Sequence, residues 1–323
     1  MLIQAVAALL ALPCLAISLA RVVGGVSRSP VPQLAAFLPW AVLGWIAVLV
    51  VLVAGRRWWP AAVVALVVLA QLPWILPARG AAAVTADRPG AVTLRVMTVN
   101  VLVGGADVSA VLEQVGRDEV DLLAVQEGLP GLVERLDKEL AASLPHVLRS
   151  DPADPAGTVV WSRWPLSRLG PSFGEGRQIF RSTLLVPGAA PVTLTAVHTM
   201  SPGRGRIGGW TRDLVAIARH AEQTSGAQIL LGDFNATRDH EPFRRLLRTG
   251  LVDAAEAVGT PPWRGATWPA DRELPLVGRL PAAVRLDHVL VTPGAVAVRS
   301  ARPILVPRTD HRALRVDLEL APS

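Results

Sequence analysis

The sequence predicts an α+β domain with mixed β-sheets, preceded by an apolar helical region. Three apolar runs almost free of acidic residues occupy the first 76 of the 323 residues. From Val92 onward, short apolar runs alternate with segments of helical period. Several of the predicted strands follow one another directly, which favours mixed sheets over an all-parallel sheet. The expected organisation is a helical region at 1–76, a linker at 77–91 and a folded domain at 92–323.

The helical region contains apolar runs at residues 2–19, 34–54 and 61–76. The first two are long enough to cross a bilayer, which needs about 20 apolar residues. The third is shorter and contains Gln71 and Pro73, so the sequence leaves open whether it crosses fully. A cleaved signal peptide would also explain the first run, but the two runs behind it favour three retained transmembrane helices.

Three crossings would place the amino terminus and the folded domain on opposite sides of a membrane. Arg21 and Arg28 flank one face and Arg56 and Arg57 the other, so the positive-inside rule gives nearly balanced counts. The adjacent arginine pair lies in a very short loop, which favours a cytoplasmic position for that loop. We therefore expect a multi-pass protein of the cell membrane, with the lipid bilayer as a partner and an extracytoplasmic folded domain.

Most of the net charge belongs to the helical region. Six arginines against one aspartate give the first ninety residues +5 of the total of +6, so the folded domain is nearly neutral. A neutral domain argues against a long nucleic-acid footprint, which needs many phosphate contacts from Lys and Arg. The single cysteine, Cys14, excludes a disulfide within the chain and a cysteine zinc site.

Periodicity and capping residues place the elements of the folded domain. Strands are expected at 92–101, 121–126, 157–162, 179–186, 192–198, 229–231, 286–291 and 314–320. Helices are expected at 108–117, 132–142, 209–224 and 241–248, the first capped by Asp107 or Ser109. The longest helix leads into the short strand at 229–231, which precedes the most informative residues of the chain.

The apolar run at 229–231 predicts a buried strand that stops at Gly232. Strand alternation would put Asp233 and Asn235 on one side and turn Phe234 away to pack. A carboxylate and a carboxamide presented together can hold a water molecule and contact a metal-bound phosphate. Taken alone, the same residues are equally well explained as an Asx-rich turn.

Five further sites also have polar residues at the ends of apolar strands. They are Asn100, Glu127, His198, Asp287 and the pair Asp310–His311. Each alone has an ordinary explanation, such as a turn former, a helix cap or an interior histidine. Six such sites in one chain favour a functional cleft, because strand ends present side chains to a cleft.

In this order, the residues resemble the motifs of the endonuclease/exonuclease/phosphatase superfamily, which has the DNase-I-like fold. The resemblance extends from Val92 to Leu320, with further matches in GTVVWSRWP at 157–165 and ATWP at 266–269. It implies a four-layer α/β/β/α sandwich and the hydrolysis of phosphoesters. It also implies Glu127 as the primary Mg²⁺ ligand, with Asn100 and Asp310 close to the metal; Mn²⁺ would suit the same oxygen ligands.

The resemblance also implies catalytic roles. Asp233, supported by Asn235, would orient and deprotonate the attacking water. His311 would contact the phosphate, and Asp287 would hold that imidazole and favour its charged form. His198 would donate to a phosphate oxygen or to the leaving group.

Two features bear on the substrate. The chain has no tyrosine, although abasic-site endonucleases of this superfamily carry one near the phosphate. Arg204 and Arg206 lie in a Gly/Arg-rich segment after His198, where they would either hold a substrate phosphate or be solvated.

His288 follows Asp287 on a strand and should point the other way, so it is excluded from the site.

These observations predict a membrane-anchored, Mg²⁺-dependent phosphoesterase without an obligate protein partner. The substrate would be a phospholipid head group, a small phosphoester or nucleic acid, as a monoester or a diester. One alternative is a membrane-tethered nuclease. The other is a catalytically silent, membrane-tethered binding domain, which is disfavoured because Glu127, Asp233, Asn235 and His311 are all present.

Overall fold

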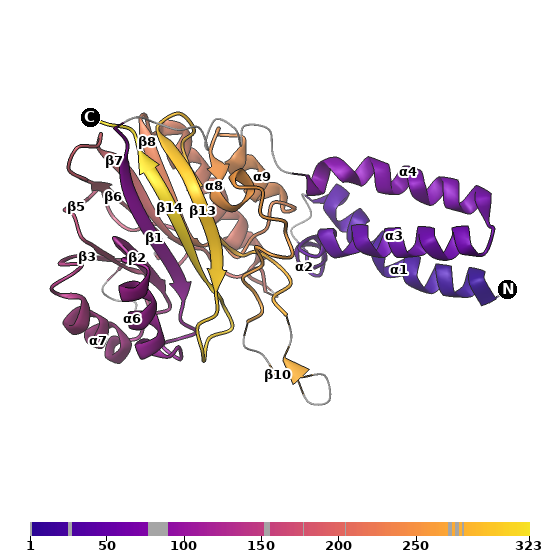
Figure 1. The fold of residues 1–323 in the computed structure, drawn as a ribbon, viewed down its shortest axis with the longest axis horizontal. Helices are drawn as coiled ribbons and strands as arrows, with labels where there is room; N and C mark the ends of the chain where they lie inside the picture. Colours follow the sequence, from indigo (N-terminus) through magenta and orange to yellow (C-terminus); the bar gives the residue numbers. More distant parts are fainter. Residues whose placement is uncertain are drawn as a thin grey trace.

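A computed structural model describes residues 2–24, 28–76, 90–151, 156–176, 178–203, 205–270, 273–274, 278–279 and 281–323. A bundle of helices formed by the first 76 residues projects from one end of a domain that contains the β-sheets (Figure 1). The expected linker at 77–91 lies mostly outside the described residues.

The first large sheet has six strands. In spatial order they are β13 (Val296–Ile304), β14 (Ala313–Leu320), β1 (Val92–Asn100), β2 (Leu122–Gln126), β4 (Val159–Ser162) and β3 (His146–Arg149). β1 and β2 are parallel, whereas the other neighbouring strands are antiparallel. The sheet is therefore mixed, as the sequence predicted.

The second large sheet also has six strands and one parallel pair. In spatial order they are β5 (Leu166–Arg168), β6 (Phe180–Leu184), β7 (Val192–His198), β8 (Ala227–Asp233), β12 (Asp287–Val291) and β9 (Val252–Asp253). β7 and β8 are the parallel pair, and β12 runs antiparallel to β8. A separate short hairpin pairs β10 (Glu273–Leu274) with β11 (Gly278–Arg279).

The two large sheets pack face to face, and helices cover their outer faces. The core between the sheets includes Val96 of β1 and Leu231 of β8. The helices are α6 (Val108–Arg117) and α7 (Pro130–Leu140) on the first sheet, and α8 (Ile207–Gln223) and α9 (Glu241–Leu247) on the second. This arrangement is the layered α/β/β/α architecture that the family resemblance implies.

Local signals account for several element boundaries. The Asp107 side chain accepts hydrogen bonds from the backbone N–H groups of Ser109 and Ala110, and so caps α6 as predicted. The prediction that the central strand stops at Gly232 is wrong, because β8 continues through this glycine to Asp233. The sequence pattern did not predict β13, in which a register irregularity at 298–300 interrupts the alternation.

Within its described residues, the helical bundle contains three long helices and one short helix. They are α1 (Leu2–Val23), α2 (Val31–Ala35), α3 (Leu38–Ala54) and α4 (Trp58–Ile75). The apolar run expected as one helix at 34–54 is divided, and α3 begins beside Pro39, a residue suited to a first helical turn. The amino terminus and the α3–α4 turn lie at the end of the bundle far from the domain (Figure 1).

The surface of the bundle is apolar. α1 and α4 are long and apolar enough to cross a membrane, and α3 is a shorter apolar helix of 17 residues. Large apolar side chains on these helices are exposed, including Leu9 at 73%, Leu66 at 66% and Trp59 at 80%. Exposed apolar surface of this extent is typical of surfaces that contact lipid or protein.

Candidate active site

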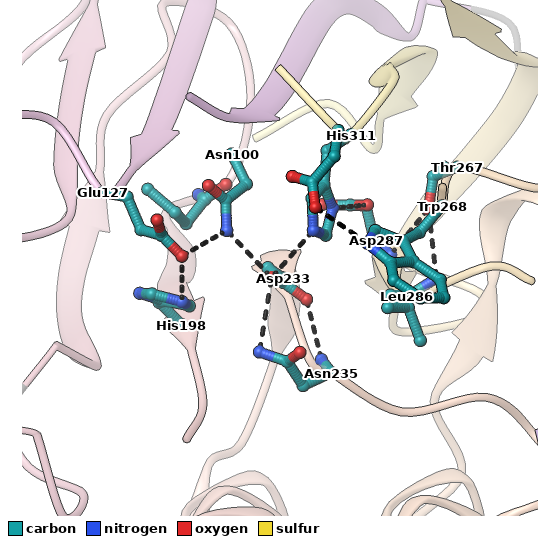
Figure 2. A network of polar contacts seen from close by, with 12 residues as sticks. Asn100, Glu127, His198, Asp233, Asn235, Thr267, Trp268, Leu286, Asp287 and His311 are labelled. Atoms are coloured by element: carbon teal, nitrogen blue, oxygen red, sulfur yellow. Dashed lines mark hydrogen bonds and ion pairs between the residues drawn. The ribbon is translucent and has the colours of Figure 1, made fainter. Parts of the chain in front are cut away.

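Strand ends bring the predicted site residues to one edge of the two sheets. β1 and β2 are parallel, so Asn100 and Glu127 leave the first sheet together. In the second sheet Asp233 lies between His198 on β7 and Asp287 on β12. Because the sheets face each other, these side chains form one polar network (Figure 2).

Asp233 lies at the centre of this network and is buried, with 1% of its surface exposed. Its Oδ1 accepts a hydrogen bond from the Asn235 backbone N–H at 2.8 Å, and its Oδ2 accepts one from Asn100 Nδ2 at 3.1 Å. Burial raises the pKa of this carboxyl, an effect that the charge of His311 opposes. A carboxylate with a raised pKa beside a cavity is suited to accept a proton.

Asn235 reaches the same side as Asp233 through a turn rather than by strand alternation. Its φ is 47°, in the left-handed region, where asparagine is among the better-tolerated residues. Its Nδ2 donates to the Thr199 backbone oxygen at 3.0 Å and also lies 3.3 Å from Asp233 Oδ2. Phe234 is fully buried on the opposite side and packs edge-on against Phe243.

A buried histidine and carboxylate pair faces Asp233. His311 Nδ1 lies 2.8 Å from Asp287 Oδ2, and His311 Nε2 lies 3.8 Å from Asp233 Oδ2 (Figure 2). Burial alone would lower the pKa of His311, but Asp287 and Asp233 outweigh it and raise the pKa to about 10. The imidazole is therefore held as a cation beside the cavity.

Glu127, Asn100 and His198 form the other half of the network. Glu127 Oε1 accepts a hydrogen bond from Asn100 Nδ2 at 3.0 Å and lies 3.6 Å from His198 Nε2. Its Oε2 accepts from the Val103 backbone N–H at 2.9 Å. The backbone φ of Glu127 is 59°, and strained conformations of this kind concentrate at functional sites.

Loop residues that the sequence analysis gave no role support the site. Trp268 Nε1 donates to Asp310 Oδ2 at 3.1 Å, and the Thr267 hydroxyl accepts from the Asp287 backbone N–H at 3.3 Å. The Thr309 hydroxyl donates to the Asn100 backbone oxygen at 2.7 Å. The ATWP segment was a detectable signal for two of these residues, but the sequence does not show which side chain each would contact.

One group of side chains that could hold a divalent cation is Asp233, Asp287 and His311. Their candidate ligand atoms lie within 4.8 Å of one another. A histidine binds a metal ion as the neutral imidazole, so a cation bound here would have to displace the proton that the two carboxylates favour on His311.

Glu127, Asn100 and Asp310 are a second set of residues that could hold a hard divalent cation. All three offer side-chain oxygen atoms, and all three line one cavity. Among the carboxylates that pair with the histidines of the site, Glu127 is the most exposed. Its side chain is 24% exposed, compared with 1% for that of Asp233. The donor chemistry matches Mg²⁺ or Mn²⁺, as the family resemblance implies.

The cavity beside the network has a volume of about 660 Å³. Seven of the eight residues expected to act in catalysis or metal binding line it. The eighth, Asp287, lies behind His311. Arg206 also lines it, whereas Arg204 lies outside the described residues.

His288 points away from this cavity, as predicted. Its Nδ1 pairs with the buried Asp253 carboxylate, and its Nε2 lies 2.8 Å from the Ala236 backbone oxygen. Its ring packs against Phe243 and Phe234. His288 is thus a structural residue of the outer core.

Comparisons with known proteins agree with this geometry. Residues 97–311 match the model of the endonuclease/exonuclease/phosphatase family. Among solved structures, a family protein from Beutenbergia cavernae is 22% identical, with 71% of this chain and 72% of that chain covered and a TM-score of 0.53. No curated protein matches the sequence.

Two further similar structures are a DNA-bound protein and an endonuclease. D. rerio TDP2 in complex with a single-strand DNA product is 16% identical, covering 70% of this chain and 98% of that chain, with a TM-score of 0.56. An AP endonuclease from Archaeoglobus fulgidus is 16% identical, covering 69% and 98%, with a TM-score of 0.55. At these identities the likeness shows the fold alone. The family match over most of the sequence shows that the chain belongs to the endonuclease/exonuclease/phosphatase family, whose members hydrolyse phosphoester bonds.

Proposed function

We propose that this protein is a membrane-anchored phosphoesterase that depends on a divalent cation and cleaves a phosphodiester or phosphomonoester with water. One observation carries this proposal. A buried carboxylate, Asp233, and a histidine held as a cation by Asp287 lie 3.8 Å apart beside one cavity. This arrangement supplies a proton acceptor for water and a positive charge for the phosphate.

The chain's own residues account for each requirement of the reaction. Asp233 accepts a proton from the attacking water, while Asn235 and Asn100 fix its carboxylate. A bond forms between the water oxygen and phosphorus as the opposite ester bond breaks. His311 stabilises the negative charge on the phosphoryl oxygens.

The departing oxygen needs a proton or a nearby hydrogen-bond donor. His198 suits this role because it lines the cavity, where its Nε2 lies 3.6 Å from Glu127 Oε1. Glu127, Asn100 and Asp310 would hold Mg²⁺, or Mn²⁺, which when bound neutralises phosphate charge.

The membrane anchor is proposed from the bundle. Its helices expose apolar side chains along their length. Only 22% of the apolar stretch of α1 and 17% of that of α4 are buried. The amino terminus and the Arg56–Arg57 turn lie at the end opposite the catalytic domain (Figure 1). We propose a multi-pass protein of the cell membrane with the catalytic domain on the extracytoplasmic side.

The test uses the full-length protein in detergent, with Mg²⁺ or with EDTA. The substrates are bis(4-nitrophenyl) phosphate, 4-nitrophenyl phosphate and plasmid DNA. We expect Mg²⁺-dependent turnover of at least one ester and a loss of about 10²–10⁴-fold in kcat for Asp233→Asn. Asp317→Asn, at a half-buried strand position that does not line the cavity, is the matched control and should keep wild-type turnover.

The other outcomes separate the alternatives. Turnover that survives EDTA, or that is equal in the Asp233→Asn protein, would contradict the mechanism. Cleavage of plasmid DNA with a steep dependence on salt would favour the membrane-tethered nuclease. Absence of turnover, with no Glu127-dependent stabilisation by Mg²⁺, would leave the silent binding domain.

A further inference from the structure

The helical bundle forms one wall of the catalytic cavity. Gln33, Ala36 and Phe37, at α2 and at the start of α3, line the same cavity of about 660 Å³ as Asp233 and His311. The catalytic domain supplies the ionisable side chains of the cavity, and the bundle adds mainly apolar ones. A substrate in this cavity must therefore contact both parts of the chain.

Specific contacts hold α2 against the catalytic domain. His240 Nε2 lies 2.8 Å from the Pro32 backbone oxygen, and the Gln33 side-chain amide donates to the Pro202 backbone oxygen. Arg21 of α1 pairs with Asp239 at 3.0 Å, and only 2% of this carboxylate side chain is exposed. Asp239 and His240 follow Asn235 by a few residues, so the anchoring loop is continuous with the catalytic loop.

The cavity is poorly suited to a polyanion. Among the described residues that line it, Arg206 is the only arginine or lysine. Long nucleic acids are bound mainly through many Lys and Arg contacts to phosphates. Apolar side chains of the catalytic domain also line the cavity, namely Leu102, Val284 and Leu286. Burying the apolar part of a ligand there is favourable, whereas a small polar ester would leave this wall unused.

The position of this wall points to the source of the ligand. α2 lies at the end of the bundle next to the catalytic domain (Figure 1). If the long helices cross a membrane, this end lies at the surface of the bilayer. The apolar wall would then be continuous with the lipid-facing surface of the bundle, within reach of a lipid in that leaflet.

We propose that the substrate is a lipid phosphoester of the bilayer, with its phosphate at Asp233 and His311 and its apolar part against Ala36 and Phe37. This inference rests on the proposed phosphoesterase function and names its substrate class. Hydrolysis adds water across one P–O ester bond, so the phosphate keeps the water oxygen and the departing oxygen gains a proton. Gln33 Oε1 is buried and has no partner within the described residues, so it would accept a hydrogen bond from the polar head group.

The test measures how the length of the substrate's alkyl chain affects hydrolysis when the leaving group stays the same. The substrates are ethyl and octyl 4-nitrophenyl phosphate, which share the leaving group and differ by six methylenes. With full-length protein in nanodiscs, we expect kcat/KM to be at least about 30-fold higher for the octyl ester. Phe37→Asp and Ala36→Trp should each bring this ratio to within a few-fold of one, the first by charging the wall and the second by filling it.

The matched control is Leu34→Asp. Leu34 lies on α2 and is not among the residues that line the cavity. The control has the same new charge beside the bilayer and should keep the wild-type ratio. An octyl-to-ethyl ratio near one in the wild-type protein, or equal ratios in all variants, would overturn the inference while leaving hydrolysis of the ethyl ester intact.

A binding measurement decides the inference even if neither ester is hydrolysed. Ethyl phosphate and octyl phosphate are titrated into the Asp233→Asn protein in nanodiscs, and empty nanodiscs correct for partitioning. We expect octyl phosphate to bind at least about tenfold more tightly, and Phe37→Asp to remove the difference. Equal affinities would overturn the lipid assignment, whereas absent hydrolysis with unequal affinities would overturn only the proposed phosphoesterase.

Discussion

The backbone positions at or near the cavity that have positive φ angles include Glu127 at 59°, Gly232 at 141° and Asn235 at 47°. For Glu127 and Asn235, the unusual backbone re-aims a side chain into the polar network at the point where a strand ends. Gly232 serves a different purpose, because it lies inside β8 and directly opposite Val197 of the parallel strand β7. The site thus depends on backbone conformation as much as on side-chain identity.

Replacing Gly232 with alanine tests this dependence. A Cβ atom at position 232 would lie 1.9 Å from the Val197 backbone oxygen, so β7 and β8 would have to separate. We expect Gly232→Ala to lower the free energy of unfolding by about 3 kcal/mol or more. Chemical denaturation of the full-length protein measures the change.

Gly131→Ala is the matched control for this substitution. Gly131 lies in α7, and a Cβ there meets nothing within 4 Å. Alanine is favoured over glycine in a helix, so the control should keep or slightly raise the free energy of unfolding. Equal stability of the two variants would show that the close approach of β7 and β8 can relax without cost.

The residues of the site were more predictable than their contacts. Asn100, Glu127, His198, Asp233 and Asp287 each end or begin an apolar strand, and that pattern is visible in the sequence. The close approach that makes Gly232 necessary is not visible, because it depends on the distance between two strands. Contacts from loops remote in the chain, such as Trp268 to Asp310, likewise depend on the folded topology.

At the scale of elements, the loop between β8 and α9 holds the catalytic domain against the bundle through side-chain contacts. Within this loop, the hydrogen bonds of both ring nitrogens fit His240 as a neutral imidazole. Its Nδ1 accepts from the Thr237 backbone N–H at 2.7 Å, which leaves Nε2 to donate to the Pro32 backbone oxygen at 2.8 Å. Burial lowers the pKa of this histidine from its ordinary value of 6.5 to about 4.

This shift predicts a loss of stability in acid. Because the folded-state pKa lies below 6.5, the contribution of His240 is fully present above pH 6.5 and is lost as the pH falls toward 4. The linkage is worth roughly 3 kcal/mol over that interval. We expect the free energy of unfolding of the wild-type protein to fall more steeply between pH 6.5 and 4 than that of His240→Gln.

His146→Gln, which replaces a partly exposed histidine on the edge strand β3, serves as the control. It should follow the wild-type pH dependence, because position 240 stays a histidine. Parallel curves for the wild-type and His240→Gln proteins would show that His240 is not held neutral at the junction.

The elements were predictable where one physical signal dominated. The amphipathic period and the Asp107 cap placed α6 correctly, and the two parallel pairs follow from strands joined by helices. The run at 34–54 was uniformly apolar, so hydropathy alone gave no sign that α2 separates from α3. That break matters, because it places α2 over the catalytic cavity.

At the scale of the whole molecule, the bundle and the catalytic domain together line one cavity. The bundle exposes apolar side chains outward, while its end next to the domain completes the cavity. The amino terminus and the α3–α4 turn lie at the opposite end (Figure 1). The proposed orientation therefore puts these two features on the cytoplasmic side, with the catalytic cavity at the outer surface of the membrane.

Cysteine labelling in intact cells tests this orientation. Cys14 is the only cysteine and is buried, so a Cys14→Ala background leaves no other thiol. Ser323→Cys, at the exposed end of the catalytic domain, should react with a membrane-impermeant maleimide. Arg57→Cys, next to the exposed Trp58 in the α3–α4 turn, should react only after the cells are permeabilised. The reverse pattern would place the cavity at the cytoplasmic leaflet. Labelling of both positions in intact cells would contradict a membrane-spanning bundle, because both ends of the bundle would then be open to the medium.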